Sequence, residues 1–234
     1  MSNGSVASST LDPRFVPLKN GLIVSCQVPD DTAINTPEFI AAQALTVLQA
    51  GAVGIRAQGT HNVEAISKIT KVPIIGLVKR YDDSSPVYIT PSVSDVVELE
   101  RAGATIVAID ATGRLRPGGQ TLQDFITQIR LESNVLLLAD VDSVESALQA
   151  EELGCDAVAT TLSGYTDIPI KGLPNIDLIA EISQRVKVPV IAEGGFSQPA
   201  SVAEAFTAGA LSVCIGTAIT NPYLLTKHFL AAIN

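Results

Sequence analysis

Short, almost wholly apolar runs recur along the chain from Gly21 onward, and longer segments with a different pattern separate them. These runs, rich in Val, Ile and Leu, occupy residues 21–27, 53–58, 73–80, 105–112, 134–142, 156–164, 189–195 and 211–217. Because they are apolar without clean alternation, they are typical of strands buried on both faces of a parallel sheet. The pattern therefore predicts eight parallel β-strands.

The segments between the runs have apolar residues near a 3.6-residue spacing and end on glycine, as helices do. Clear examples are residues 37–51, 92–103, 143–154 and 201–209, with Thr36, Ser92, Ser143 and Ser201 as expected N-caps. Strict alternation of strand and helix requires parallel strands joined by right-handed crossovers. Eight such units favour a (β/α)8 TIM barrel, and an open doubly wound sheet is the alternative. No GxGxxG motif follows the first strand, which argues against that alternative.

The chain has 234 residues, 47% of them hydrophobic, and a net charge of -9, which suits one large soluble domain or two small ones. Residues 1–19 are Ser-rich and aperiodic, so we expect a loosely held tail before a catalytic barrel domain at 20–234. Cys26, Cys155 and Cys214 lie in apolar stretches and are expected to be buried thiols. The acidic balance and the lack of a long apolar run or signal peptide predict a cytoplasmic protein without nucleic-acid or membrane partners.

Polar residues gather where the predicted strands end. These are Gln27, Arg56, Lys79 with Arg80, Asp110, Asp140, Ser163 with Gly164, Glu193, and Gly216 with Thr217. In a (β/α)8 barrel the carboxyl ends of all strands meet at one face, and that face carries the chemistry. Any one of these residues could simply mark the start of a loop, but together they predict a site.

Lys79 and Glu193 each follow an apolar run and differ in chemical type. Burial moves the pKa values of a lysine and a glutamate toward each other, so the pair could accept and donate protons on one substrate. An ion pair that seals the barrel is the alternative. Arg80 is expected to turn outward, because neighbouring residues of a strand point to opposite faces, or else to hold a neighbouring carboxylate.

Glycines follow the seventh and eighth strands. Gly194, Gly195, Gly216 and Thr217 lie where exposed backbone N–H groups can bind a phosphate, which predicts a barrel of the phosphate-binding type. A short helix expected near residues 219–223 could direct its N-terminus at the same anion. No cluster of metal ligands is apparent in the sequence.

A set of short motifs, in this order and at these spacings, resembles the N-acetylmannosamine-6-phosphate 2-epimerase family. The motifs are GLIVSCQ, VGIRAQG, IIGLVKR, YITPS, VAIDAT, LLADVDS, TTLSGYT, VIAEGGF and IGTAIT, and the likeness spans about residues 20–232. It implies a cofactor-independent isomerase that interconverts N-acetylmannosamine 6-phosphate and N-acetylglucosamine 6-phosphate in sialic acid catabolism. It also suggests a homodimer; the apolar segment at 222–232 is consistent with packing against a partner or against the bottom of the first strand.

The resemblance also implies roles for single residues. Lys79 matches the base and proton donor at carbon 2, and Glu193 matches the acid that assists ring opening. The implied substrate-binding residues are Gln27, Arg56, Asp140, Ser163, Gly164, Tyr165 and Thr166. Arg56 is in addition our candidate for stabilising the charge of an enolate intermediate.

The chain departs from the family pattern near the expected phosphate. The family usually has an arginine where AITNP has Asn221, and often a basic or larger residue where AEGG has Gly195. Neutral donors bind anions more weakly than cations do, so phosphate affinity should be lower unless the backbone N–H groups of the glycines compensate. Two alternatives to an epimerase stay open: an aldolase-type lyase with Lys79 as a Schiff base, and a phosphosugar-binding sensor without turnover.

Overall fold

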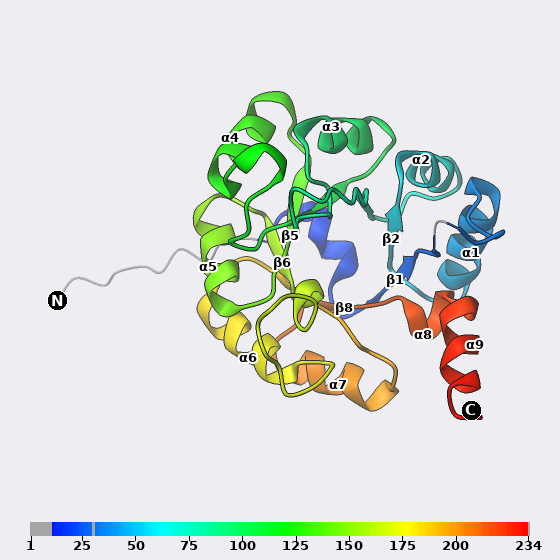
Figure 1. Ribbon diagram of the computed structural model, residues 1–234. Coiled ribbons are helices and arrows are strands. Elements are labelled where there is room, and N and C mark those ends of the chain that lie inside the picture. The colour runs from blue at the N-terminus through cyan, green and yellow to red at the C-terminus, as the bar shows by residue number, and fades with distance from the viewer. Residues whose placement is uncertain (1–10, 30, 234) are drawn as a thin grey trace.

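A computed structural model describes residues 11–29 and 31–233 and shows a closed barrel of parallel strands (Figure 1). The strands are β1 (Leu22–Cys26), β2 (Gly54–Gln58), β3 (Ile74–Leu77), β4 (Ile106–Asp110), β5 (Leu136–Asp140), β6 (Ala157–Ala159), β7 (Val190–Glu193) and β8 (Ser212–Ile215). Each strand pairs with the next in sequence, and β8 pairs with β1 to close the barrel. The predicted (β/α)8 TIM barrel and the order of its eight strands are confirmed.

Helices surround the barrel, as Figure 1 shows. They are α1 (Pro37–Gln49), α2 (Thr60–Ile69), α3 (Val93–Arg101), α4 (Leu122–Glu132), α5 (Val144–Glu152), α6 (Ile176–Arg185), α7 (Pro199–Thr207), α8 (Thr217–Thr220) and α9 (Pro222–Leu230). Thr36, Ser92 and Ser143 cap α1, α3 and α5 with their side-chain oxygens, as predicted. None of the helices in the described residues is long and apolar enough to cross a membrane.

Alternation along the strands separates the barrel interior from the layer under the helices. The side chains that face the interior form one cluster, which includes Ile23, Ile75, Leu77, Ile106, Leu136, Leu138, Ala159, Ile191 and Cys214. Their neighbours in sequence, such as Val24, Ile74 and Val107, pack outward against the helices instead. Cys26, Cys155 and Cys214 are buried free thiols, as predicted.

The amino-terminal segment closes one end of the barrel. We expected residues 1–19 to be a loose tail; residues 1–10 lie outside the described residues, and for residues 13–18 the expectation is wrong. Pro13–Leu18 form a 3-10 helix capped by Asp12. Phe15 and Leu18 are fully buried in the interior cluster. Burying two large apolar side chains holds this segment firmly in place.

Two local predictions are wrong. Ser201 is not an N-cap, because α7 begins earlier, at Pro199 after Gln198; proline suits the first helical turn. The short helix expected at 219–223 is instead divided between α8 and α9. The division falls at Asn221, whose side chain accepts a hydrogen bond from the Leu224 backbone N–H and begins α9.

Candidate active site

The predicted site residues at the strand ends occupy interior-facing positions. Arg56 pairs in register with Ile75, and Glu193 with Cys214, both members of the interior cluster. Asp140 pairs with Ala159, which also faces inward. Paired residues of neighbouring strands point to the same face, so Arg56, Asp140 and Glu193 converge on the barrel axis. They do so at the carboxyl ends of β2, β5 and β7.

The Arg56 guanidinium joins two carboxylates in the barrel interior. It donates to both oxygens of Asp140, at 2.9 and 2.6 Å, and to Glu193 Oε2 at 2.7 Å. The side chains of Arg56 and Asp140 are 2% and 0% exposed, and that of Glu193 is 13% exposed. Of the three, Glu193 is therefore the group that solvent or a ligand can reach. We refer to these three residues as the buried charge cluster.

Glu193 holds its proton more tightly than an ordinary glutamate. Burial raises its pKa, and the nearby Asp140 carboxylate adds to the rise, while Arg56 opposes it. Arg56 does not cancel the rise because its single charge is shared with Asp140, which it binds through two hydrogen bonds. A carboxyl group in this state keeps its proton to a higher pH than an ordinary glutamate does and is suited to act as a proton donor.

Threonines of the segment after β6 support the buried charge cluster, and sequence reasoning missed them. Thr161 donates to Asp140 Oδ1 at 2.6 Å. Thr160 accepts a hydrogen bond from the Glu193 backbone N–H and donates one to its carbonyl. The TTLSGYT motif contains both residues, but only the fold shows which partners they contact, because β6 ends at Ala159.

Lys79 lies beyond the end of β3 in an antiparallel pairing with residues 88–90. Arg80 donates its backbone N–H to Tyr88, Thr90 donates to Val78, and Lys79 bridges Ile89. The YITPS motif thus fixes the backbone on both sides of Lys79. The same segment reaches β4, because Asp110 donates its backbone N–H to the Ile89 carbonyl.

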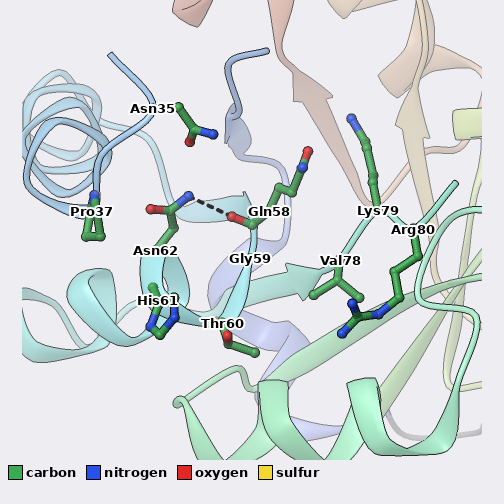
Figure 2. Close-up of a pocket in the computed structure, with 10 residues that line it drawn as sticks. All are labelled: Asn35, Pro37, Gln58, Gly59, Thr60, His61, Asn62, Val78, Lys79 and Arg80. Carbon is green, nitrogen blue, oxygen red and sulfur yellow. Dashed lines mark hydrogen bonds between the residues drawn. The ribbon is translucent and has the colours of Figure 1, made fainter. Parts of the chain in front are cut away.

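Lys79 and Arg80 point in opposite directions (Figure 2). Arg80 turns outward, as predicted, and forms an ion pair with Asp95 of α3 at 2.6 Å. Lys79 continues the inward alternation of Ile75 and Leu77. Since β3 and β7 are four strands apart in a barrel of eight, Lys79 and Glu193 approach the axis from opposite walls.

A cavity of about 330 Å³ lies beside Lys79, at the carboxyl ends of β1 to β3. Its lining is Asn35, Pro37, Gln58, Gly59, Thr60, His61, Asn62, Val78, Lys79 and Arg80 (Figure 2). The Asn62 side chain donates to the backbone carbonyl of Gln58 at 2.8 Å. The side chain of Gln58 extends to the same side as that of Lys79 (Figure 2). Apart from Lys79 and Arg80 this lining is mainly neutral and polar, a composition suited to a hydroxyl-rich ligand. Glu193 does not line this cavity.

Gln27 and the loop after β6 complete the predicted substrate-binding set. Gln27 donates to Ser25 at 2.8 Å, and its Oε1 is buried without a hydrogen-bond partner among the described residues. Ser163 is buried and accepts a hydrogen bond from Asn175, the N-cap of α6. Beyond it, Gly164 has a positive φ, Tyr165 is 57% exposed and Thr166 is half-buried. Gln27 therefore presents an acceptor to the site, whereas Ser163 serves to hold the loop.

The predicted phosphate-binding glycines lie in turns after β7 and β8. Gly194 and Gly195 both have positive φ, which side chains tolerate poorly. Gly216 precedes α8 and lies against Ser25, and Thr217 is exposed at the start of α8. Asn221, at the position where the family pattern has arginine, is buried and occupied in capping α9.

The fold and this geometry define a class of protein: a (β/α)8 barrel with acid, base and cationic groups converging on the face at which such barrels carry out chemistry. A structure described as the N-acetylmannosamine-6-phosphate 2-epimerase from Clostridium perfringens aligns with a TM-score of 0.86 and 38% identity, over 92% of this chain and 94% of its own. A thiamine phosphate pyrophosphorylase from Pyrococcus furiosus shares the fold at 18% identity, with a TM-score of 0.59.

Sequence comparison identifies the family. The model described as N-acetylmannosamine-6-phosphate epimerase matches residues 40–234. A relative from Caldanaerobacter subterraneus named N-acetylmannosamine-6-phosphate 2-epimerase is 42% identical over 92% of both chains, and one from Clostridioides difficile is 39% identical over 92% of this chain and 97% of its own. The chain belongs to this family of carbohydrate epimerases, which are isomerases.

Proposed function

We propose that the chain interconverts N-acetylmannosamine 6-phosphate and N-acetylglucosamine 6-phosphate, as a step in the catabolism of sialic acid. The named activity of its relatives supports the substrate. The observation that carries the proposal is the geometry of the barrel interior. Lys79 and Glu193, a base and an acid, enter it from opposite walls, and the pKa of Glu193 is raised.

The reaction inverts carbon 2, and its chemistry sets the requirements. The hydrogen on carbon 2 is acidic only when that carbon is next to an aldehyde, so the sugar ring must first open. A base then removes the proton, and the electrons pass to the carbonyl oxygen to give an enolate. Return of a proton to the opposite face gives the epimer, so atoms and charge balance without any other reactant.

Lys79 supplies the proton transfer at carbon 2 in this proposal. Its unprotonated amine accepts the proton and the resulting ammonium can return one. The pairing with residues 88–90 supports this role, because it fixes the backbone from which the side chain extends. Gln27 directly follows β1, Gln58 is the last residue of the neighbouring β2, and both offer amide groups to the sugar and its N-acetyl group.

Glu193 donates a proton to the ring oxygen during opening and exchanges protons with the carbonyl oxygen afterwards. Its raised pKa keeps the acid form available. Arg56 holds Glu193 in position, and because its own side chain is covered, its positive charge acts on the developing enolate through Glu193 rather than by direct contact, in a region shielded from water. Asp140 acts through Arg56, because its own side chain is wholly covered.

Exchange of the carbon 2 hydrogen tests the proposal. In deuterated water the wild type should incorporate deuterium at carbon 2 of both sugars, followed by proton NMR. Lys79→Ala should reduce this exchange by a factor of 10² or more, about the usual contribution of a general base. Lys68→Ala, which removes an exposed lysine of α2, serves as the matched control.

Three results would count against the proposed function. Unchanged exchange in Lys79→Ala would remove the lysine from the mechanism, and sugar binding without any exchange would favour a sensor. A Lys79–sugar adduct trapped by borohydride would instead indicate a lyase with a Schiff base.

A further inference from the structure

The turns after β7 and β8 carry no cationic side chain of their own. They read GGFSQ at 194–198 and GTAITNP at 216–222, without lysine, arginine or histidine. In phosphate-binding barrels these two turns hold the anion, and their backbone N–H groups are the donors. A cation that assists them here must therefore come from another segment of the chain.

The loop between β6 and α6 covers the glycine turn after β7. A Cβ built on Gly195 would collide with Leu173 of this loop. One built on Gly164 would collide with Ile170 of the same loop. Both apolar side chains therefore pack directly on glycines, and Lys171, which lies between them in the sequence, is held beside the turn. The loop thus brings a lysine to the place where a phosphate is expected.

Lys171 is close enough to this turn to reach a phosphate bound there. It precedes Leu173 by two residues, so at most about 7 Å separates their Cα atoms. Its four-carbon stem carries the ammonium further, and the side chain is 96% exposed. A Cβ built on the next residue, Gly172, would meet no atom of the described residues within 4 Å, so the space beside Lys171 is open.

Three arginines near the strand ends are instead held at short distance by carboxylates. The pairs are Arg56 with Asp140, Arg80 with Asp95, and Arg114 with Asp110, each at 2.6 Å. Lys79 follows β3, which lies across the barrel from β7, and it acts at carbon 2 in the proposed function. These cations have other partners or another place, whereas Lys171 belongs to the loop that contacts the turn.

Lys171 has only a weak partner in the structure. Its ammonium lies 3.8 Å from an oxygen of Asp177, in the first turn of α6, and the Asp177 side chain is 87% exposed. Water screens an exposed ion pair at this distance, so the pair holds the lysine loosely. A phosphate group carries more charge than one carboxylate and offers more acceptor oxygens, so it should draw the ammonium away from Asp177.

From the loop that covers the turn and the loose pairing of its lysine, we propose that Lys171 binds the 6-phosphate of the substrate and that Asp177 competes for the same ammonium. This inference rests on the proposed function and names the cation that recognises its phosphate. It gives Lys171 a role in substrate affinity and none in proton transfer. Removing the lysine should therefore raise KM and leave kcat nearly unchanged, as expected for binding that is equal in the ground and transition states.

The experiment measures carbon 2 exchange of N-acetylmannosamine 6-phosphate by Lys171→Met. We expect KM to rise about tenfold, the usual effect of losing one hydrogen bond to a charged group, and the inhibition constant of inorganic phosphate to rise with it. Lys187→Met is the matched control, because Lys187 is also exposed but precedes β7, at the opposite end of the barrel. An unchanged KM in Lys171→Met, or an equal rise in both variants, overturns the inference while the proposed function stands.

Asp177→Asn tests the competition, because it removes the charge and keeps the size of the side chain. It should lower KM a few-fold when Lys171 is present and have no effect in the Lys171→Met background. No change in either background, or the same change in both, would overturn the proposed competition.

Inorganic phosphate separates this inference from the proposed function. If the wild type exchanges no sugar, the proposed function fails, and calorimetry with inorganic phosphate then tests the lysine by itself. Tighter binding by the wild type than by Lys171→Met would support the phosphate site, and added salt should reduce that difference. Equal binding, or no binding by either protein, would overturn the inference.

Discussion

Removing the arginine from the buried charge cluster should destabilise the protein severely. Arg56→Met keeps an unbranched side chain of similar length but leaves Asp140 and Glu193 without a cation in the barrel interior. Three hydrogen bonds of 2.6–2.9 Å are lost, all to carboxylates that are at most 13% exposed. Breaking a buried pair from one side typically costs about 3–5 kcal/mol.

The size of this effect can be measured by thermal unfolding followed by circular dichroism. For a chain of this length 1 kcal/mol corresponds to about 2–4 °C, so Tm should fall by roughly 6–20 °C. Arg185→Met is the matched control, because Arg185 pairs with Glu181 on the exposed surface of α6 at 3.4 Å. That exposed pair should contribute no more than about 0.5 kcal/mol.

The pH dependence of this loss gives a second check. Arg56 lowers the pKa of Glu193, so without it burial raises that pKa further above its unfolded value, and the native state binds more protons than the unfolded state. The stability of Arg56→Met should therefore rise as pH falls, and the difference in free energy of unfolding between the variant and the wild type should shrink between about pH 7 and about pH 5. A variant as stable as the wild type at neutral pH, or a deficit that grows on acidification, would refute this account of the cluster.

Three further predictions concern other regions. Arg116 is fully buried over the Phe125 ring, its Nε and Nη1 have no partner among the described residues, and burial lowers its pKa to about 10. Arg116→Met should therefore lower the free energy of unfolding by less than about 1 kcal/mol or raise it. A loss of stability as large as that of Arg56→Met would contradict this. Phe15→Ala should lower the free energy of unfolding in urea by about 3–5 kcal/mol, whereas Val16→Ala, at a 55% exposed neighbour, should lower it by less than about 0.5 kcal/mol. Equal losses would contradict the role of Phe15 and Leu18 as a plug that closes one end of the barrel. We also predict a homodimer through α9, where Phe229 is 70% exposed. In light scattering, Phe229→Glu should dissociate the dimer, and Leu131→Glu on α4 should leave it intact. A monomeric wild type would contradict this prediction.

The sequence was sufficient for the barrel and for the directions of its side chains. Each strand is an apolar run without helical periodicity, so its assignment as a β-strand was well determined. The order of the strands followed from their alternation with helices. Alternation alone predicted that Arg80 turns outward from its strand, and its ion pair with Asp95 confirms this. These features depend on residues close together in the chain.

The sequence did not predict contacts set by distant segments. Arg56 lies 84 residues from Asp140 and 137 from Glu193, and no local pattern indicates that one guanidinium binds both. Thr161 and the plug of Phe15 and Leu18 were missed for the same reason. The plug has a local signal, since Asp12 precedes Pro13 as an N-cap precedes a first helical residue, but only a closed barrel gives its apolar residues a place to pack.

The two ends of the candidate site differ in how strongly their charge is fixed. On one side, Arg56, Asp140 and Glu193 form a cluster in which every charge has a partner, so a change in one alters the protonation of the others. On the other, the turns after β7 and β8 carry no charge, and Asn221 contributes to helix capping. In the proposed function, ring opening depends on Glu193 at the first end, whereas proton transfer at carbon 2 depends on Lys79, which approaches from the opposite wall. A substitution in the uncharged turns should therefore change the binding of one substrate group and leave the acid–base groups in place.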